Sequence, residues 1–132
     1  MNRDETINII AVDNSPADLV YLEHEFKKSR YSINLKSFTS GLDALEYLKN
    51  DLSEDQSLMP QLFLLDYNMP GMLGTDFLRE VRKDSRFSDT PAGVMIGSYF
   101  EKKAWSEEDL NITGYFEKPV DLKDLEEYID KI

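Results

Sequence analysis

The chain has 132 residues, with 26 Asp and Glu against 15 Lys and Arg and a formal net charge of −11. That length suits one compact domain, and a hydrophobic content of 41% is enough for its core. The acidic excess argues against a surface for nucleic acid or an anionic membrane, because both require clustered basic side chains. The absence of cysteine excludes disulfides and thiolate zinc sites, and the single histidine excludes poly-histidine metal sites.

The chain also lacks the apolar segments of membrane-spanning and exported proteins. Its longest strongly apolar runs have about four to six residues, and residues 1–6 are polar. The sequence predicts neither a transmembrane span nor a signal peptide, so we expect a soluble protein of the cytoplasm.

The first apolar run is followed by a segment with a helical pattern. Residues 7–12 are rich in β-branched side chains and predict a strand, and residues 13–16 combine helix-capping side chains with a proline typical of a first helical turn. Apolar residues then recur at three- and four-residue spacing up to about residue 28, which predicts an amphipathic helix. The expected apolar face consists of Leu19, Leu22 and Phe26, with Ala17, Val20 and Tyr21 beside them.

The same pattern of strand and helix repeats before the middle of the chain. Residues 33–38 indicate a second strand, and Ser40 follows as a helix cap. The expected stripe of the second helix consists of Leu42, Leu45, Tyr47 and Leu48. After a polar segment at residues 50–61, residues 62–65 are continuously apolar, as in a parallel strand buried on both faces.

The second half of the chain adds two strands and three helices. We predict a third helix around residues 77–81, a fourth strand at 93–96, a fourth helix around 102–110, a fifth strand at 114–116 and a last helix at 121–132. The connections are too long for hairpins. Five strands in alternation with five helices therefore predict a doubly wound α/β fold, in which a five-stranded parallel sheet carries helices on both faces.

In such folds ligands bind beyond the carboxyl ends of the strands, so the polar residues at these ends are the candidates for a functional site. Because these ends meet at one edge of a parallel sheet, we expect the side chains there to converge. The residues that follow the strands are Asp13, Asn14, Asp66, Asn68, Gly97, Ser98 and Lys118.

The chemistry of these residues suits Mg²⁺ and a phosphoryl group. Carboxylate and amide oxygens are the hard ligands that Mg²⁺ prefers, and the Lys118 ammonium group suits a phosphate oxygen. Asp66 is then either a metal ligand only or a nucleophile that forms an aspartyl phosphate, and the metal together with the lysine favours the second role. A hydroxyl donor such as Ser98 would hold a third phosphoryl oxygen.

Three segments together resemble the receiver domain of two-component response regulators. They are LLDYNMPGMLG at residues 64–74, the Lys118–Pro119 pair after a short strand, and VDNSP at residues 12–16. The resemblance extends over essentially the whole chain and is to the stand-alone, CheY-like form. It implies a flavodoxin-like (βα)5 fold and one receiver domain over residues 1–132, without an output domain.

By this resemblance, Asp66 is the phosphoacceptor, and the phosphoryl group comes from a histidine kinase or a histidine phosphotransfer protein. Mg²⁺ would be held by Asp13, Asn14, Asp66 and the backbone carbonyl of Asn68. Lys118 would contact the phosphoryl group, and the Lys–Pro peptide that follows is commonly cis in the family. Phosphorylation would change the affinity for a downstream protein partner, with no enzyme activity beyond self-catalysed phosphotransfer and autodephosphorylation.

The resemblance also assigns the residues of a conformational switch. Tyr115 falls at the position of the family's aromatic switch residue, which turns inward on phosphorylation. The Thr or Ser that normally ends the fourth strand corresponds to Ile96 or to Gly97, and neither has a hydroxyl group. Ser98 would then act in the switch only if the local backbone shifts by one or two residues.

A second departure from the family concerns the metal. Asp13 is followed by Asn14, where the family usually carries a second acidic residue, so we expect weaker binding of Mg²⁺. These departures leave one alternative open, a degenerate receiver that acts as a phosphorylation-independent protein-interaction domain.

Two rival classes fit the sequence less well. A phosphatase of the haloacid-dehalogenase type would need a second Asp two residues after Asp66, where Asn68 stands. Nucleotide binding would need a glycine-rich phosphate loop after the first strand, and the sequence has none there.

Overall fold

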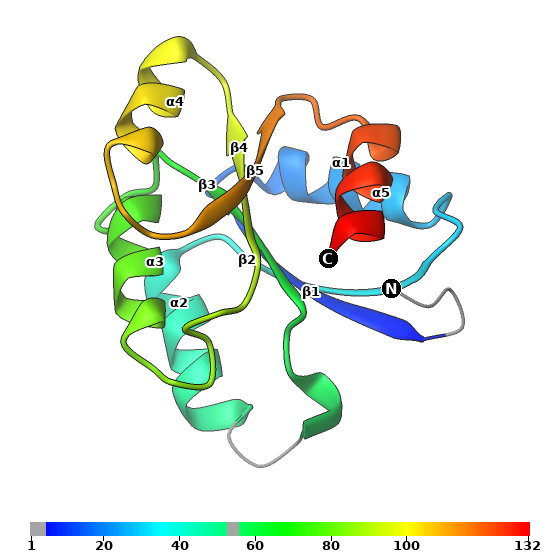
Figure 1. The fold of residues 1–132 in the computed structure, drawn as a ribbon, viewed down its shortest axis with the longest axis horizontal. Coiled ribbons are helices and arrows are strands. Elements are labelled where there is room, and N and C mark those ends of the chain that lie inside the picture. Colours follow the sequence, from blue (N-terminus) through cyan, green and yellow to red (C-terminus); the bar gives the residue numbers. More distant parts are fainter. Residues whose placement is uncertain (1–4, 53–55) are drawn as a thin grey trace.

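A parallel sheet forms the centre of the molecule in a computed structural model, which describes residues 5–52 and 56–132 (Figure 1). Within these residues, five strands pair in the order β2-β1-β3-β4-β5, all of them parallel. Their bounds are β1 (Thr6–Val12), β2 (Ser32–Phe38), β3 (Leu62–Asp66), β4 (Ala92–Ile96) and β5 (Ile112–Glu117).

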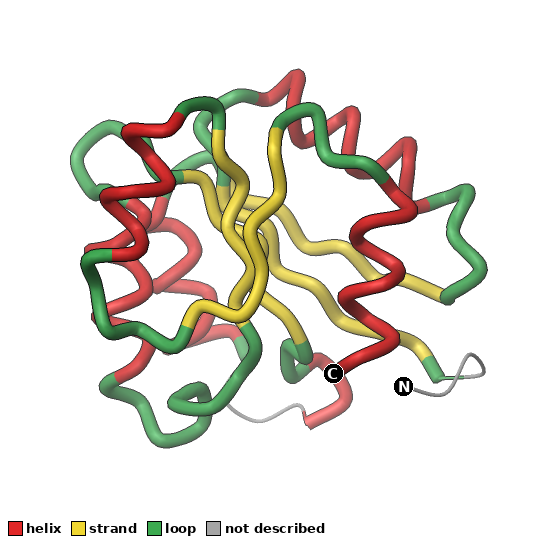
Figure 2. The backbone as a smooth tube through the Cα atoms, turned by 45° about the horizontal axis from the view of Figure 1, so that its top comes forward, coloured by secondary structure: helices red, strands yellow, loops and turns green. Residues whose placement is uncertain are grey.

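Helices cover both faces of this sheet, with a separate apolar core on each side (Figures 1 and 2). The helices are α1 (Pro16–Phe26), α2 (Gly41–Glu46), α3 (Gly74–Arg82), α4 (Tyr99–Ser106) and α5 (Leu122–Lys131). One face carries α1 and α5, and the other carries α2, α3 and α4. A π-helical turn at Tyr47–Asp51 continues α2, and a 3-10 turn at Gln56–Leu58 precedes β3. The doubly wound α/β fold predicted from the sequence is therefore confirmed.

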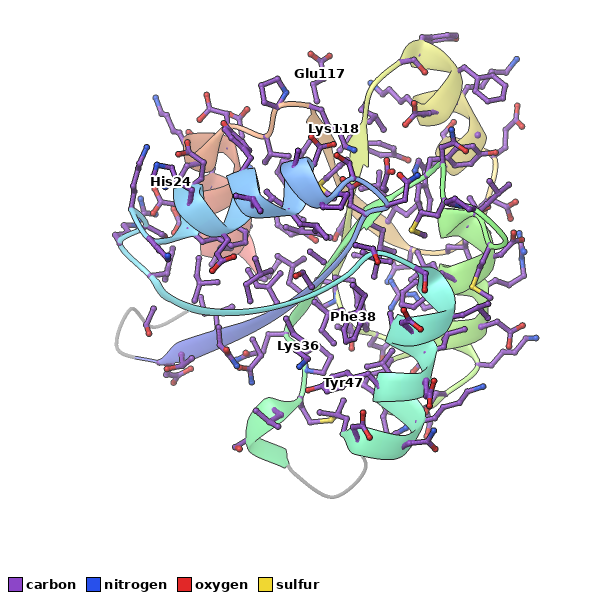
Figure 3. All side chains as sticks on the ribbon, turned by 180° about the vertical axis from the view of Figure 1, so that it is seen from behind. His24, Lys36, Phe38, Tyr47, Glu117 and Lys118 are labelled. Carbon is purple, nitrogen blue, oxygen red and sulfur yellow. The ribbon has the colours of Figure 1, made fainter. Side chains whose placement is uncertain are left out.

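The strands differ in burial according to their place in the sheet. Every residue of β3 and β4 is buried, as the continuous apolar run of residues 62–65 predicts for a central strand. The edge strand β2 is partly exposed. There the Lys36 ammonium group lies 6.0 Å from the centre of the Phe38 ring and 5.2 Å from that of Tyr47 (Figure 3). A lysine on an edge strand disfavours pairing with another chain.

Four of the apolar residues expected on helix faces are exposed: Ala17, Val20, Tyr21 and Leu42. Leu42 is 60% exposed, because Ala44 takes the core position on that face of α2 beside Leu45. Val20 is 64% exposed on α1, whose buried residues are Leu19, Leu22 and Phe26. The predicted stripe of the second helix is thus wrong at Leu42, and the apolar face predicted for the first helix is wrong at Ala17, Val20 and Tyr21.

The fourth helix begins earlier than the sequence pattern predicts. It spans Tyr99–Ser106 rather than residues 102–110, because Ser98 caps it and accepts a hydrogen bond from the Glu101 backbone N–H at 3.3 Å. Its first two residues, Tyr99 and Phe100, are exposed aromatics, so the amphipathic pattern of the segment does not mark this start.

Arg82 binds the two loops that precede β4 and β5. Its guanidinium group donates hydrogen bonds to the carbonyl oxygens of Phe87, Thr90, Leu110 and Asn111, at 2.6–3.3 Å. One turn earlier on α3, Arg79 pairs with Glu108 at 2.9 Å. These contacts hold the segment after α4 against α3.

Candidate functional site

The carboxyl ends of β1 and β3 bring two aspartates together. These strands are neighbours, with Val12 paired to Leu65, so Asp13, directly after β1, and Asp66, the last residue of β3, stand side by side. Both are buried. The chain passes to opposite faces of the sheet after β1 and β3, and this reversal of strand order is the position at which doubly wound folds bind ligands.

Lys118 reaches these carboxylates from the end of β5. Its backbone N–H bonds to the Ile96 carbonyl at 3.0 Å, which fixes the start of its side chain. Its Nζ lies 2.8 Å from Asp13 Oδ2 and 3.3 Å from Asp66 Oδ1. The following Lys118–Pro119 peptide is cis, as the resemblance to receiver domains implies.

A third carboxylate contacts the same ammonium group, and the sequence analysis did not find it. Asp18 Oδ2 accepts a hydrogen bond from Lys118 Nζ at 3.0 Å. Asp18 lies in the first turn of α1 rather than at a strand end. Helical side chains lean toward the N-terminus of their helix, so this carboxylate reaches back toward the strand ends.

The buried carboxylates and the lysine shift each other's protonation. Burial, reinforced by the negative charge of Asp13, raises the pKa of Asp66 to about 6, although Lys118 and a hydrogen bond from the Tyr67 backbone oppose this. Burial alone would lower the pKa of Lys118. Its hydrogen bonds to Asp13 and Asp18 and the charge of Asp66 outweigh burial and raise that pKa, so the lysine is charged at neutral pH.

The residues present suit a hard divalent cation that keeps part of its water shell. Asp13 and Asp66 supply carboxylate oxygens, with Asp13 Oδ1 held by the Ser15 backbone N–H at 2.9 Å. Asn14, directly after Asp13, and Asn68, two residues after Asp66, are exposed. In the described parts of the chain, no group of three or more His, Cys, Asp or Glu side chains converges as a metal site. Two carboxylates, together with water and phosphoryl oxygens, are the ligands that usually coordinate Mg²⁺ in proteins.

The end of β4 is open where the family usually has a hydroxyl side chain. Ile96 is buried in the core on the α3 and α4 face, and Gly97 follows it. A Cβ atom at Gly97 would meet only Glu101 Oε2, at 3.5 Å, which is ordinary contact. Ser98 is exposed, and its hydroxyl is engaged with Glu101.

A cavity of about 370 Å³ lies beyond this strand end. Its lining residues are Ile96, Gly97, Ser98, Tyr99, Lys102, Glu117 and Lys118. Lys118 therefore lines this cavity and also contacts Asp13 and Asp66, which with it form the acidic pocket. Ser98 lies on the wall of the cavity. Tyr115, the residue at the aromatic switch position, does not line this cavity. It is exposed within β5, and the Nζ of Lys102, a residue of the cavity wall, lies 5.8 Å from its ring centre.

The turn after β3 is closed by aromatic packing. The Tyr67 ring lies 6.1 Å from the buried Trp105 ring and 6.2 Å from Phe100, in edge-on geometry. Gly74 donates its backbone N–H to the Tyr67 carbonyl at 2.8 Å. A Cβ atom at Gly74 would lie 2.1 Å from the Asp66 carbonyl oxygen and 2.6 Å from Trp105, so only glycine fits there.

The fold and the site together define a doubly wound α/β domain with a buried Asp pair and a lysine at its topological switch point. Comparison with known proteins then gives the family. The model of the response regulator receiver domain matches residues 9–130. The chain therefore belongs to the receiver domain family of two-component response regulators.

Individual relatives agree with this membership. Response regulator Rcp1 of Synechocystis is 29% identical over 117 residues, which cover 89% of this chain and 80% of Rcp1. A two-component response regulator from Legionella pneumophila has a TM-score of 0.79 and 31% identity, over 95% of this chain and 96% of its own. The structure of the Mn²⁺-bound form of Rcp1 has a TM-score of 0.72 and 28% identity, over 96% of this chain and 91% of its own.

The helices within residues 5–52 and 56–132 do not include one with the length and apolar character that a membrane span requires.

Proposed function

We propose that this receiver accepts a phosphoryl group on Asp66 in the presence of Mg²⁺ and thereby changes its affinity for a protein partner. The observation that carries the proposal is the geometry around Asp66, a buried carboxylate with Lys118 Nζ 3.3 Å away and the Asp13 carboxylate beside it. A buried carboxylate between a second carboxylate and a lysine suits a nucleophile whose product carries extra negative charge.

The proposed donor is a phosphohistidine of a histidine kinase or of a phosphotransfer protein, acting in the cytoplasm. An Asp66 oxygen forms the new bond to phosphorus while the P–N bond breaks, and the imidazole keeps the electron pair and takes a proton from water. Lys118 offsets the charge that develops on one phosphoryl oxygen. Mg²⁺, when bound, supplies the remaining neutralisation, and Asp13, Asn14, Asp66 and the Asn68 carbonyl are the proposed ligands.

The proposed switch consists of one hydroxyl residue, Ser98, and one aromatic residue, Tyr115. Ser98 lines the cavity beside Lys118. Tyr115 does not line that cavity, and its ring lies 5.8 Å from the Nζ of Lys102, which does. After a local movement of the backbone, the Ser98 hydroxyl would donate a hydrogen bond to a phosphoryl oxygen. The Tyr115 ring would turn inward as part of the conformational response.

The competing function is a receiver that binds its partner without phosphorylation, for which Asn14 and Gly97 are the motivating departures. Asp66, Asp13 and Lys118 are nevertheless all present and in contact. A chain that had lost phosphoacceptor chemistry would gain nothing from keeping these charges buried, which costs stability.

Intact-mass measurement after incubation with acetyl phosphate and Mg²⁺ tests the proposal. We expect an adduct of about 80 Da that requires the metal and Asp66, as for an aspartyl phosphate. Asp66→Asn and a sample treated with chelator are the controls. No adduct at saturating donor and Mg²⁺, together with unchanged Trp105 and tyrosine fluorescence in beryllofluoride, would favour the phosphorylation-independent function.

A further inference from the structure

Lys118 has a contact that is independent of the two strand-end aspartates. Asp18 Oδ2 lies 3.0 Å from Lys118 Nζ and is itself 46% exposed in its side chain, whereas Asp13 is fully buried. Figure 3 shows Lys118 beside the beginning of α1. The Asp18 backbone N–H bonds to the Ser15 hydroxyl at 3.3 Å, so helix capping fixes the residue that carries this carboxylate.

The charge of the pocket depends on this contact. Asn14 is neutral, so Asp13 and Asp66 alone leave one net negative charge after Lys118 is counted. Asp18 adds a second. A hard dication is held largely by the charge of its site, so this additional carboxylate offsets the charge that Asn14 does not provide.

Asp18 also differs from the other two carboxylates in what happens to it when a cation binds. Asp13 and Asp66 are the proposed metal ligands, so a bound dication would take up their charge and would repel the lysine. Asp18 contacts Lys118 without being among those ligands. It is the partner that can keep the ammonium group within reach of a phosphoryl group on Asp66.

We propose that Asp18 is a positioning residue, which holds Lys118 at the pocket and supplies the negative charge that Asn14 lacks. This inference rests on the proposed phosphoacceptor function of Asp66. Its plain alternative is that Asp18 only stabilises the first turn of α1, as acidic residues do near helix N-termini.

The chain offers a matched control for that alternative in α2. Asp43 stands in the same place relative to Ser40 as Asp18 does to Ser15, since its backbone N–H bonds to the capping hydroxyl at 3.1 Å. Asp43 is exposed and lies on the other face of the sheet from α1. Asp43→Asn therefore removes the same helix-end charge without touching Lys118.

The first measurement is the affinity for Mg²⁺ alone, by titration calorimetry of the full chain. We expect Asp18→Asn to weaken binding roughly fivefold, Asp18→Glu to retain most of it, and Asp43→Asn to leave it unchanged. Equal affinities for Asp18→Asn and Asp43→Asn would overturn the charge role.

The second measurement separates charge from lysine placement. The double variant Asn14→Asp with Asp18→Asn restores the number of carboxylates, so we expect its Mg²⁺ affinity to return to at least that of the wild type. Its rate of adduct formation with acetyl phosphate at saturating Mg²⁺ should stay about fivefold or more below the wild type, because a charge-assisted hydrogen bond to Lys118 is missing. A rate equal to that of the wild type would overturn the positioning role.

The two levels of proposal fail in different ways. If the wild type forms no adduct, the phosphoacceptor function fails and the positioning role with it. If the wild type forms the adduct and Asp18→Asn does so at the same rate and Mg²⁺ affinity, only the inference about Asp18 fails. Unfolding curves of each variant show whether any loss comes from the fold itself.

Discussion

Two glycines close to the site lie in opposite surroundings. Gly74, which follows the β3 turn, has the Asp66 carbonyl oxygen and the Trp105 ring where a side chain would begin. Gly97, which follows β4, has ordinary contact distance to a single carboxylate oxygen and a cavity beyond it. The chain after β3 is thus packed without space for a side chain at Gly74, and the neighbouring end of β4 has room for one.

This difference separates the two parts of a receiver. The groups of the acidic pocket are fixed by buried strands and by ion pairs at 2.8–3.3 Å. Of the groups that would respond to a phosphoryl group, Ser98 stands at the open end of β4 and Tyr115 lies exposed within β5. Packing therefore constrains Asp13, Asp66 and Lys118 more strongly than it constrains Ser98 and Tyr115.

The largest expected effect is at the closed end. Gly74→Ala should lower the free energy of unfolding by about 3 kcal/mol or more, because the new methyl group overlaps backbone and ring atoms that cannot move separately. Urea unfolding followed by circular dichroism measures it. Gly71→Ala is the control, since Gly71 has a φ of +77° with no atom near the added Cβ and should lose about 1 kcal/mol. Similar losses at the two glycines would refute the closed packing after β3.

The second effect concerns the carboxylate that this packing encloses. The pKa of Asp66 is raised to about 6 in the fold from 3.8, so its ionisation disfavours the metal-free folded state. The stability that the protonated form provides is complete below about pH 4 and is lost as the pH rises through 6. Asp66→Asn does not titrate, so its advantage over the wild type should grow by about 2 to 3 kcal/mol between pH 4 and pH 7.

Denaturant unfolding in chelator at several pH values tests this dependence. Addition of Mg²⁺ should reduce the difference at pH 7, because a bound cation favours the ionised carboxylate. A stability difference that is independent of pH would mean that Asp66 is solvated despite its burial.

The smallest effect is expected at the open end. Gly97→Ala should change stability by less than about 1 kcal/mol, since nothing obstructs the methyl group. Gly97→Thr adds a hydroxyl donor at the strand end and should speed adduct formation with acetyl phosphate a few-fold over Gly97→Ala. If the two variants react equally fast, a hydroxyl at this position does not reach the phosphoryl group.

Much of this architecture follows from short sequence patterns. The apolar run at residues 62–65 is continuous because both faces of β3 are covered, and this run places Asp66 at a strand end. The convergence of Asp13, Asp66 and Lys118 then follows from parallel topology alone. A strand that is buried on both faces is predicted most reliably in this chain, because its apolar run is not interrupted by solvent-facing polar residues.

Hydrophobic periodicity does not predict which side chain of a helix reaches the site, or at which residue a helix with exposed aromatic residues begins. Asp18 contacts Lys118 although it lies five residues after Asp13, because the side chains of α1 lean back toward the strand ends. The start of α4 was misplaced because Tyr99 and Phe100 are exposed on it, 80% and 68% respectively, which reverses the usual meaning of aromatic residues. The cap at Ser98 was the signal that could have corrected it.

The contacts of Arg79 and Arg82 have a mechanical consequence for α4. They anchor the chain just after this helix, at Glu108, Leu110 and Asn111, to α3. The opposite end of α4 starts at the open strand end. Apart from the contact of Phe100 with Tyr67, the first turn of α4 is exposed, whereas Trp105 near its other end is buried. With its last turn anchored to α3, α4 would behave as a lever, in which a displacement at Ser98 moves the first turn farther than the last.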